Sequence, residues 1–332
     1  MAEVLCTLPL PAPFEEMVRP RASLSVLGRI APSAELAERL RAHPVDVLCP
    51  QLRDPITADL LDAGLPTLRC VSLYAVGYNN VDVDAATQRH IAVSNTPGVL
   101  TDATADCTLA LLLAAARRIC EGDAAARAGA FQGWEPDYML GMELTGALLG
   151  VVGFGRIGQA VARRALGFGL RIAYSTDVEV SIDADIQGRV TELPIAELLS
   201  TADVISLHVP LTDATHHLID ERALRSMRSS SVLVNTSRGP VVDETALVRA
   251  LREGWIAAAG LDVYENEPQL APGLVECRNA VLSPHLGSAT VATRAAMARL
   301  TAQNSLDAID GRVPTNCVNP SAWEGGAPPA VS

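Results

Sequence analysis

The sequence predicts an α/β protein built from two doubly wound parallel sheets. The chain has 332 residues, which exceeds the usual size of a single domain. Short apolar runs alternate with amphipathic helical stretches in both halves of the chain, and strands that alternate with helices are typical of a parallel sheet. A glycine-rich turn at residues 153–158 follows the first apolar run of the second half.

Four strands are expected before residue 98, and they are 22–27, 45–49, 68–73 and 91–94. Amphipathic helices are expected to begin near Ser33 and near Thr57, with leucines on their inward faces. Both residues are predicted to be N-caps because their side-chain oxygens can accept from the first helical N–H groups. The turn sequence Asn95-Thr96-Pro97-Gly98 then ends this first alternation.

The middle of the chain, about 102–146, lacks the alternation. Residues 102–120 are apolar almost all round, which predicts a helix buried between domains or at a contact between subunits. Residues 129–146 combine glycines with Trp134, Pro136 and Tyr138, and we expect an ordered arm without helix or strand.

The alternation restarts after residue 146. Strands are expected at 148–152, 171–174, 204–208, 232–235, 257–263 and 280–282, and helices at 159–168, 195–200, 221–227, 244–253 and 289–310. The simplest arrangement is a domain at 98–288 inserted into another domain made of 1–97 and 289–319. The segment 320–332 is rich in Pro, Gly and Ala, which predicts disorder.

Composition and charge limit the classes of partner. The net charge of −12 disfavours binding to nucleic acid or to an anionic membrane, but it permits a small anionic substrate. The chain has no run of eighteen apolar residues and no N-terminal signal-peptide pattern. Its seven cysteines are scattered, without a Cys-x-x-Cys pair or a Cys/His cluster. We therefore expect a cytoplasmic protein with reduced thiols and no metal site.

The glycine-rich turn has the spacing Gly-x-Gly-x-x-Gly at Gly153, Gly155 and Gly158. The first glycine permits a tight turn, the second lets a pyrophosphate approach the backbone, and the third lets the helix pack close to the strand. An expected strand precedes the motif and an expected helix follows it, which is the context that a Rossmann-like dinucleotide site needs. A plain strand-to-helix turn is the alternative interpretation.

An acidic residue that binds the ribose hydroxyls is expected about twenty residues after this motif. Asp177 lies nineteen residues after Gly158, at the end of an expected strand. Its charge would repel a 2′-phosphate, so the sequence favours NAD over NADP. The alternative is that Asp177 only caps a loop and Thr176 faces the ribose, which leaves NADP possible.

Three loops at expected strand ends carry side chains suited to carbonyl reduction. Arg238, Glu267 and His285 follow successive strands, and the carboxyl ends of parallel strands share one edge of a sheet. An arginine can hold a substrate carboxylate with its planar fork of donors. A protonated histidine can donate to the carbonyl oxygen while hydride reaches the carbon, and a neighbouring glutamate would favour that protonated form.

The sequence resembles the family of D-isomer-specific 2-hydroxyacid dehydrogenases over nearly its whole length, in the manner of glyoxylate/hydroxypyruvate reductases. The matching stretches, in order, are Val76-Gly77-Tyr78-Asn79-Asn80-Val81-Asp82, Asn95-Thr96-Pro97-Gly98, Thr101-Asp102-Ala103-Thr104-Ala105-Asp106, the glycine motif, His208-Val209-Pro210-Leu211-Thr212, Ser237-Arg238-Gly239, residues 262–268 and His285-Leu286-Gly287-Ser288-Ala289.

The resemblance implies roles for individual residues and for the two domains. The catalytic set is Arg238, Glu267 and His285. The substrate contacts are Leu52, Val76, Gly77, Arg238, His285 and, from the partner of a homodimer, Trp134. The cofactor contacts are Thr104, Gly153, Gly155, Arg156, Ile157, Gly158, Thr176, Asp177, His208, Val209, Pro210, Thr236, Ser237, Arg238, Asp262, His285 and Gly287. The domain at 1–97 and 289–319 would bind substrate, and the inserted domain would bind the dinucleotide and form the dimer through about 102–146.

The sequence alone is compatible with other functions of the same fold. Corepressors that sense nucleotides share the expected fold and can retain the catalytic set. Phosphite dehydrogenases resemble the stretch from Phe131 to Trp134, but they carry a lysine where this chain has Val76. Formate dehydrogenases carry glutamine in place of Glu267. The chain also departs from the family pattern at Ala75 and Val76, which replace a small polar pair, at Asn79, which replaces an aspartate, and at Thr176, which stands at the usual acidic position.

Overall fold

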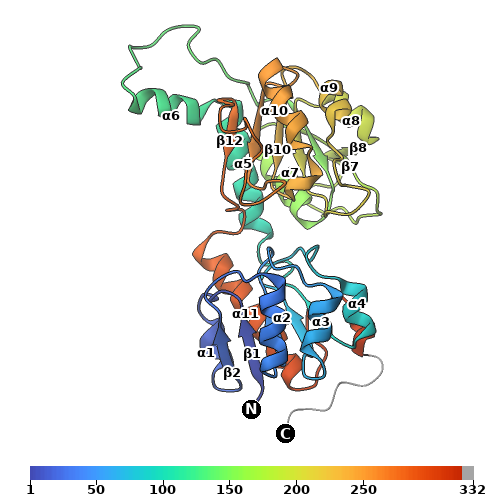
Figure 1. Ribbon diagram of the computed structural model, residues 1–332. Coiled ribbons are helices and arrows are strands. Elements are labelled where there is room, and N and C mark those ends of the chain that lie inside the picture. The colour runs from blue at the N-terminus through green and yellow to red at the C-terminus, as the bar shows by residue number, and fades with distance from the viewer. Residues whose placement is uncertain (324–332) are drawn as a thin grey trace. The chain divides into compact units, whose positions relative to one another are not determined.

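The computed structural model describes residues 1–323, and the chain forms two compact units (Figure 1). One unit comprises Met1–Leu100 and the C-terminal segment that begins at Thr290, and the other comprises Thr101–Ala289. Each unit contains one parallel sheet with helices on both faces, so the predicted fold class is confirmed. Within residues 1–323, we find no helix that is both long and apolar enough to cross a membrane.

The sheet of the first unit has the order β2-β1-β3-β4-β5. Its strands are β1 (Glu3–Cys6), β2 (Ser23–Val26), β3 (Val47–Cys49), β4 (Cys70–Ser72) and β5 (Ala92–Ser94). The four strands after β1 lie within the predicted ranges. Strand β1 was not predicted because its apolar run is only three residues long, yet it pairs with β2 and β3 and its side chains from Val4 to Cys6 are at most 1% exposed.

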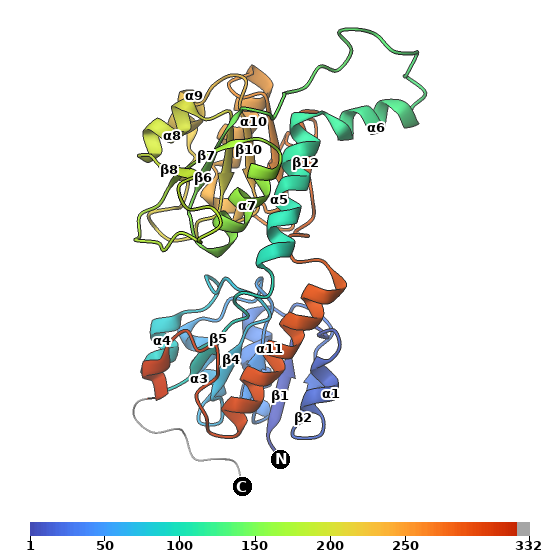
Figure 2. The ribbon, with the colours of Figure 1, turned by 180° about the vertical axis from the view of Figure 1, so that it is seen from behind.

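Five α-helices surround this sheet, namely α1 (Phe14–Val18), α2 (Ser33–Ala42), α3 (Ala58–Gly64), α4 (Val83–Gln88) and α11 (Val291–Ile309). Figures 1 and 2 show α2 and α3 on one face and α1 and α11 on the other. The N-cap predicted at Thr57 is confirmed, since its side chain accepts from Leu60 N–H. The N-cap predicted at Ser33 is wrong. Pro32 holds that position without a side-chain bond, and Ser33 is the first helical residue.

Helix α11 returns the chain to the first unit. Ser72 Oγ on β4 donates to Thr301 O at 3.2 Å, and Asn304 Nδ2 donates to Asn95 O at 3.0 Å. The disorder predicted from residue 320 is wrong for Pro320–Trp323, which forms a short 3₁₀ helix (η2). Trp323 is buried there. Burial of this large apolar side chain stabilises the packing of the segment against the first unit. The rest of that predicted segment, 324–332, lies outside the described residues.

The sheet of the second unit has the order β12-β11-β10-β9-β6-β7-β8. Its strands are β6 (Leu148–Val152), β7 (Arg171–Ser175), β8 (Val190–Glu192), β9 (Val204–Leu207), β10 (Val232–Asn235), β11 (Ala258–Leu261) and β12 (Ala280–Leu282). All the predicted strands are present, and β8 is an addition. The chain order reverses between β6 and β9, and open α/β sheets bind ligands outside the carboxyl ends of the strands at such a point.

Helices cover both faces of this second sheet. On one face α5 (Thr101–Ala116) packs against α7 (Arg156–Gly167), and the other face carries α8 (Ile195–Thr201), α9 (Glu221–Ser226) and α10 (Glu244–Glu253) (Figures 1 and 2). The 3₁₀ turn η1 (Gly239–Val241) precedes α10. Helix α5 is buried along most of its length, as its apolar composition predicts.

The single helix predicted over 102–120 is confirmed up to residue 116 and is wrong at its end. Helix α5 ends at Ala116, Arg118 adopts a left-handed conformation (φ 54°), and α6 (Ile119–Arg127) starts there. The arm at 129–146 contains neither helix nor strand, as predicted. Figures 1 and 2 show α6 and the arm projecting from the rest of their unit, and the Trp134 side chain on the arm is 85% exposed.

Candidate functional site

The glycine turn between β6 and α7 has the geometry that its spacing predicts. Gly153 has a φ of 87° and donates its N–H to Ser175 O at 2.8 Å. A Cβ atom at Gly158 would lie 2.3 Å from Gly153 O, so only glycine lets the helix approach the turn this closely. A Cβ at Gly155, by contrast, would meet nothing within 4 Å. The second glycine therefore borders open space.

The N-terminus of α7 favours an anion. Gly155 is its N-cap and makes no side-chain bond, so the first N–H groups of the helix are free to bind a ligand. The first turn contains no acidic residue, and Arg156 is exposed there with Ile157 half-buried beside it. Positive helix-dipole charge and a guanidinium thus occur together beside the open space at Gly155.

The segment after β7 carries the two candidate ribose residues. Thr176 is half-buried, and its hydroxyl donates to Val178 O at 3.2 Å. The Asp177 side chain is exposed. The position of both at the carboxyl end of β7, next to β6, fits contact with a nucleotide bound at the glycine turn.

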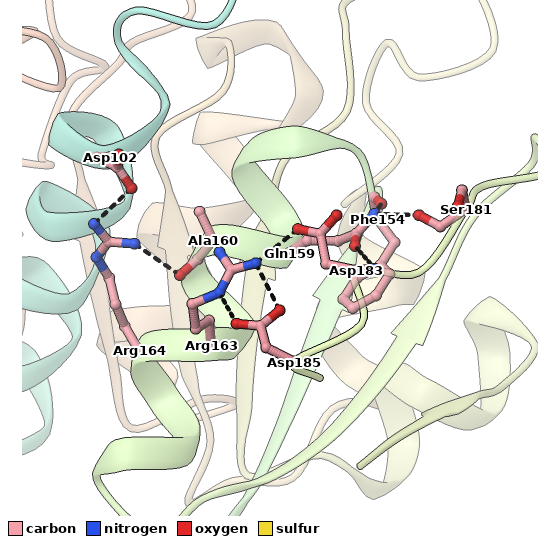
Figure 3. A network of polar contacts seen from close by, with 9 residues as sticks. All are labelled: Asp102, Phe154, Gln159, Ala160, Arg163, Arg164, Ser181, Asp183 and Asp185. Atoms are coloured by element: carbon pink, nitrogen blue, oxygen red, sulfur yellow. Dashed lines mark hydrogen bonds and ion pairs between the residues drawn. The ribbon is translucent and has the colours of Figure 1, made fainter. Parts of the chain in front are cut away.

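Helix α7 holds the residues that follow Asp177 (Figure 3). The buried Gln159 side chain donates from Nε2 to Ser181 O at 2.9 Å and accepts at Oε1 from Asp183 N–H at 2.8 Å. One turn further along the helix, Arg163 forms ion pairs with Asp183 and Asp185. The segment 181–185, which follows the two candidate ribose residues, is therefore attached to the same helix whose N-terminus borders the open space at Gly155.

The loop after β9 lies beside the glycine turn. His208 donates its backbone N–H to Val152 O at 2.7 Å, and a Cβ at Gly153 would lie 2.7 Å from the His208 carbonyl carbon. Burial lowers the pKa of His208 to about 3, so its imidazole is neutral at pH 7. Val209 is half-buried and Pro210 is exposed. This wall of the candidate cofactor site is therefore uncharged.

Thr236 connects the end of β10 to α5. Its hydroxyl lies 2.8 Å from the hydroxyl of Thr108, which donates to Thr104 O at 2.8 Å. Thr104 is buried, and its side chain lies 3.6 Å from the position of a Cβ at Gly287. Three residues predicted to contact cofactor are thus gathered in one place by α5.

Asn235 orders the turn that carries Arg238. Its Oδ1 accepts from Ser237 N–H at 3.0 Å and from Ser237 Oγ at 2.8 Å, and its Nδ2 donates to Arg238 O at 2.9 Å. Arg238 Nη1 donates to Ser237 O at 2.7 Å. Burial lowers the pKa of the Arg238 guanidinium, and the negative charge of Glu267 acts in the opposite direction. An arginine remains charged under these conditions.

His285 and Glu267 form a hydrogen-bonded pair. The Nδ1 atom of His285 lies 3.0 Å from Oε2 and 3.2 Å from Oε1 of Glu267. Burial by itself raises the pKa of Glu267, but the bond and charge of His285, the Tyr264 N–H and the charge of Arg238 outweigh it and lower the pKa overall. Glu267 is therefore an anion that only accepts hydrogen bonds, which puts a hydrogen on Nδ1 and turns Nε2 outward.

Asp262 shapes the loop that carries His285. Its side chain is 1% exposed, and its two carboxylate oxygens accept from Leu286 N–H and Gly287 N–H, both at 2.7 Å. His285 donates its own N–H to Asp262 O at 2.9 Å. His285 adopts a φ of 57°, a left-handed conformation that histidine tolerates better than most residues. The direct effect of Asp262 is therefore to position His285.

Glu244 holds the loop that carries Glu267. It lies in the first turn of α10 and is 2% exposed. Its carboxylate accepts from Glu265 N–H at 2.8 Å and from Ala271 N–H at 3.3 Å, on either side of Glu267. Burial raises the pKa of Glu244, although these two N–H groups act in the opposite direction.

Gly239 lets the Arg238 loop touch the Glu267 loop. A Cβ atom at Gly239 would lie 1.9 Å from the backbone carbonyl of Tyr264 and 2.4 Å from Glu265 N. These are backbone atoms and cannot turn aside. The absence of a side chain at Gly239 is what brings two of the three candidate catalytic residues together.

Replacing Gly239 with alanine is therefore expected to separate the two loops. We expect a loss of about 1–3 kcal/mol in the free energy of unfolding, as for other overpacked sites, together with a fall in kcat. Chemical denaturation and steady-state kinetics measure the two effects. Gly167→Ala is the matched control, because a Cβ there meets nothing within 4 Å. Full activity in Gly239→Ala would contradict this role.

The candidate substrate residues lie in the first unit. Leu52 follows β3, and Val76 and Gly77 follow β4, all three half-buried. Asn95 Nδ2 donates to Val76 O at 2.7 Å, and Asn80 Nδ2 donates to Gln51 O at 3.2 Å. Hydrogen bonds thus order both loops at the carboxyl end of the first sheet.

The structure sorts the predicted site residues into three groups. The predicted catalytic residues and all the predicted cofactor residues lie at the carboxyl edge of the second sheet, Leu52, Val76 and Gly77 belong to the first unit, and Trp134 stands on the exposed arm. Sequence reasoning missed Asn235 and Glu244. A buried polar residue at the end of an apolar strand was a usable signal for Asn235, whereas Glu244 resembles any acidic residue in the first turn of a helix.

This fold, with an anion-binding glycine turn and an Arg/Glu/His set on one sheet edge, defines a dinucleotide-binding α/β oxidoreductase. Residues 109–287 match the family model described as D-isomer specific 2-hydroxyacid dehydrogenase, NAD binding domain. The chain belongs to the family of D-isomer-specific 2-hydroxyacid dehydrogenases and is an NAD(P)-dependent enzyme.

Individual relatives agree with this assignment. The chain is 48% identical over 297 residues to a glyoxylate reductase of Thermococcus litoralis, covering 87% of each protein. It is 50% identical over 282 residues to a glyoxylate reductase of Korarchaeum cryptofilum, covering 84% of each. Among solved structures it resembles an NADPH-dependent glyoxylate/hydroxypyruvate reductase from Sinorhizobium meliloti, in complex with NADP and malonate, with a TM-score of 0.87, 32% identity and coverage of 99% of both chains.

Proposed function

We propose that this enzyme reduces a small 2-keto acid of the glyoxylate or hydroxypyruvate type to the D-2-hydroxy acid. The observation that carries the proposal is the His285–Glu267 pair, with its shorter N–O distance of 3.0 Å, beside Arg238 at the edge that carries the glycine turn. The similarity to proteins named glyoxylate reductase supports this substrate class.

In the proposed reaction His285 is the acid. Its Nδ1–H is held by Glu267, so Nε2 can donate a proton to the carbonyl oxygen of the substrate. A nicotinamide cofactor held at the glycine turn would supply the hydride for the carbonyl carbon. The oxygen receives the proton from Nε2, and the hydroxy acid is formed. In the reverse direction the neutral Nε2 takes the proton back.

Arg238 would bind the substrate carboxylate and the adjacent carbonyl through its fork of N–H donors. We further propose that Leu52 and the backbone at Val76 and Gly77 contact the carboxylate end of the substrate. In this proposal the first unit binds substrate and the second unit binds the dinucleotide.

We propose NAD as the cofactor, held by the predicted set of residues around the glycine turn. The argument for NAD over NADP is the exposed carboxylate of Asp177 at the end of β7.

Replacing Asp177 with alanine should move the cofactor preference toward NADPH. We expect the ratio of kcat/KM with NADH to kcat/KM with NADPH to fall about tenfold or more, since a hydrogen bond to a charged group contributes about 1.5–3 kcal/mol. Glu179→Ala, which alters another exposed carboxylate two residues away, should leave the ratio unchanged. An unchanged ratio in Asp177→Ala would assign the ribose to Thr176 instead.

We propose a homodimer formed through α5, α6 and the arm, in which Trp134 of the partner subunit reaches the substrate pocket. The arm and α6 present large exposed side chains, including Trp134 (85%), Phe131 (60%) and Ile119 (57%). We also propose a cytoplasmic location, since the seven cysteines carry free thiols.

Sedimentation velocity should give the mass of a dimer for the wild-type protein and for Trp134→Ala. The variant should keep its kcat with saturating keto acid but have a raised KM, because a tryptophan that lines the pocket contributes mainly to binding. A monomeric wild-type protein would refute the dimer, and an unchanged KM would remove Trp134 from the pocket.

The initial rate of cofactor oxidation tests the proposed activity. NADH and NADPH are compared against glyoxylate, hydroxypyruvate, pyruvate, a branched 2-keto acid and phenylpyruvate. We expect the highest kcat/KM with the two small acids and NADH. A preference for bulky acids would refute the proposed substrate class, and binding of NADH without turnover on any acid would favour a nucleotide-sensing module instead.

A further inference from the structure

A second group of ionisable side chains lies on the neighbouring loops, apart from the His285–Glu267 pair. His216 and His217 come from the loop between β9 and α9, and Glu265 comes from the loop after β11. One potential ligand atom from each residue lies within 4.8 Å of the other two. We propose that these three side chains bind a divalent transition metal ion of the zinc type.

The two imidazoles lie next to each other. Their rings are stacked with centroids 4.1 Å apart and planes inclined by 28°. Ring-nitrogen lone pairs lie in the ring plane, so the two neighbouring rings reach one ion after rotation about their side-chain bonds. His217 Nε2 lies 2.7 Å from Glu265 Oε1, and the ion would take the place of the hydrogen now shared by these two atoms.

Backbone hydrogen bonds hold all three ligands in place. His216 N–H donates to Thr212 O at 2.9 Å, and His217 N–H donates to Pro240 O at 2.8 Å. Glu265 N–H donates to the buried carboxylate of Glu244 at 2.8 Å. Folding therefore already brings the three ligands together, so metal binding has little further conformational entropy to lose. The His216 side chain is exposed and can turn toward the ion.

The ligand types select the ion. Two imidazoles and one carboxylate form the three-ligand set that holds zinc with a water in the fourth position, and imidazole suits zinc, copper, nickel and iron. Magnesium and calcium prefer oxygen ligands throughout. The side chains of His217 and Glu265 are 33% and 23% exposed, and His216 is exposed, which leaves room for bound water.

The proposed ion would lie outside the hydride-transfer chemistry. Glu267, two residues after Glu265, is engaged with His285, so the two carboxylates serve different partners. The sequence predicted no metal site, because Glu265 stands 48 residues after His217 and only the fold brings the loops together.

The test is zinc binding by the full-length, untagged protein in competition with a chromophoric chelator. We expect one equivalent to bind to the wild type, and His216→Ala to bind at least about 10–100-fold more weakly, the loss that even outer-shell changes cause at metal sites. The control is His43→Ala, which removes another exposed histidine and should bind as tightly as the wild type. Equal affinity in His216→Ala and the wild type would overturn the proposal.

A second measurement separates these ligands from cysteine. Cobalt bound to nitrogen and oxygen ligands should give visible d–d bands without thiolate charge transfer, and Glu265→Gln should weaken them while thermal unfolding shows that the variant is folded. A thiolate band, or loss of zinc binding in a variant without the exposed Cys120 thiol (Cys120→Ser), would overturn the proposal.

Discussion

Replacing His285 with asparagine should lower kcat for keto-acid reduction by about 10²–10⁴-fold, which is the usual contribution of a positioned general acid. Asparagine suits the site structurally, because His285 has a φ of 57° and asparagine also tolerates the left-handed region. The variant should therefore keep the loop in place and lose only proton transfer. Steady-state rates at saturating keto acid measure the effect, and NADH titration by fluorescence should show a Kd that changes far less than kcat.

The matched control is His90→Asn. His90 has a φ of 56° and an exposed side chain, but it lies in the first unit, at the end of α4. Any loss that comes from asparagine in a left-handed position would appear in this variant too. If His285→Asn retained a tenth or more of the wild-type kcat, another group would have to be the acid.

The parts of the fold that follow from short-range physics were predictable. The glycine turn is one example. Gly153 has a positive φ and Gly158 lets the helix approach the turn closely, and the Gly-x-Gly-x-x-Gly spacing predicts both features. Strand β1 was not predictable in this way. Its three apolar residues form a strand only because they pair with β2 and β3, and no local sequence pattern shows that pairing.

Local signals also failed where the chain changes direction. Nothing in the apolar pattern of 102–120 separates α5 from α6, because the break is a single left-handed residue, Arg118, whose side chain bonds to Glu121. Likewise Pro32 rather than Ser33 stands at the start of α2, since proline already has the extended conformation that an N-cap position requires.

In the site, the sequence indicated the residues that a substrate would meet but not the hydrogen bonds that position them. Arg238, Glu267 and His285 follow strands, and strand ends are where ligands bind. Glu244 and Asp262 act by accepting backbone N–H groups from loops distant in sequence, at 2.8 Å to Glu265 and 2.7 Å to Gly287. Such bonds depend on the packing of β11, β12 and α10 and leave no trace in residue spacing.

Replacing Arg238 with alanine should reduce kcat/KM for the keto acid by about 30- to 5,000-fold. Removing one partner of a buried, hydrogen-bonded charge pair costs about 2–5 kcal/mol, and each 1.36 kcal/mol is a factor of ten. The loss is expected in KM as well as in kcat, because the guanidinium holds both the carboxylate and the carbonyl. Binding of NADH and the free energy of unfolding should change little by comparison.

Arg238→Lys distinguishes charge from shape. If the site needs only a positive charge, lysine should restore most of the activity. If it needs the planar fork, lysine should remain close to alanine, while added guanidinium should partly restore the rate of Arg238→Ala. We expect the second result, since Asn235 binds both ends of this turn and thereby fixes the direction from which the side chain leaves it. Arg222→Ala, which alters an exposed arginine on α9, should behave as wild type. A fully active Arg238→Ala would mean that the carboxylate is bound elsewhere.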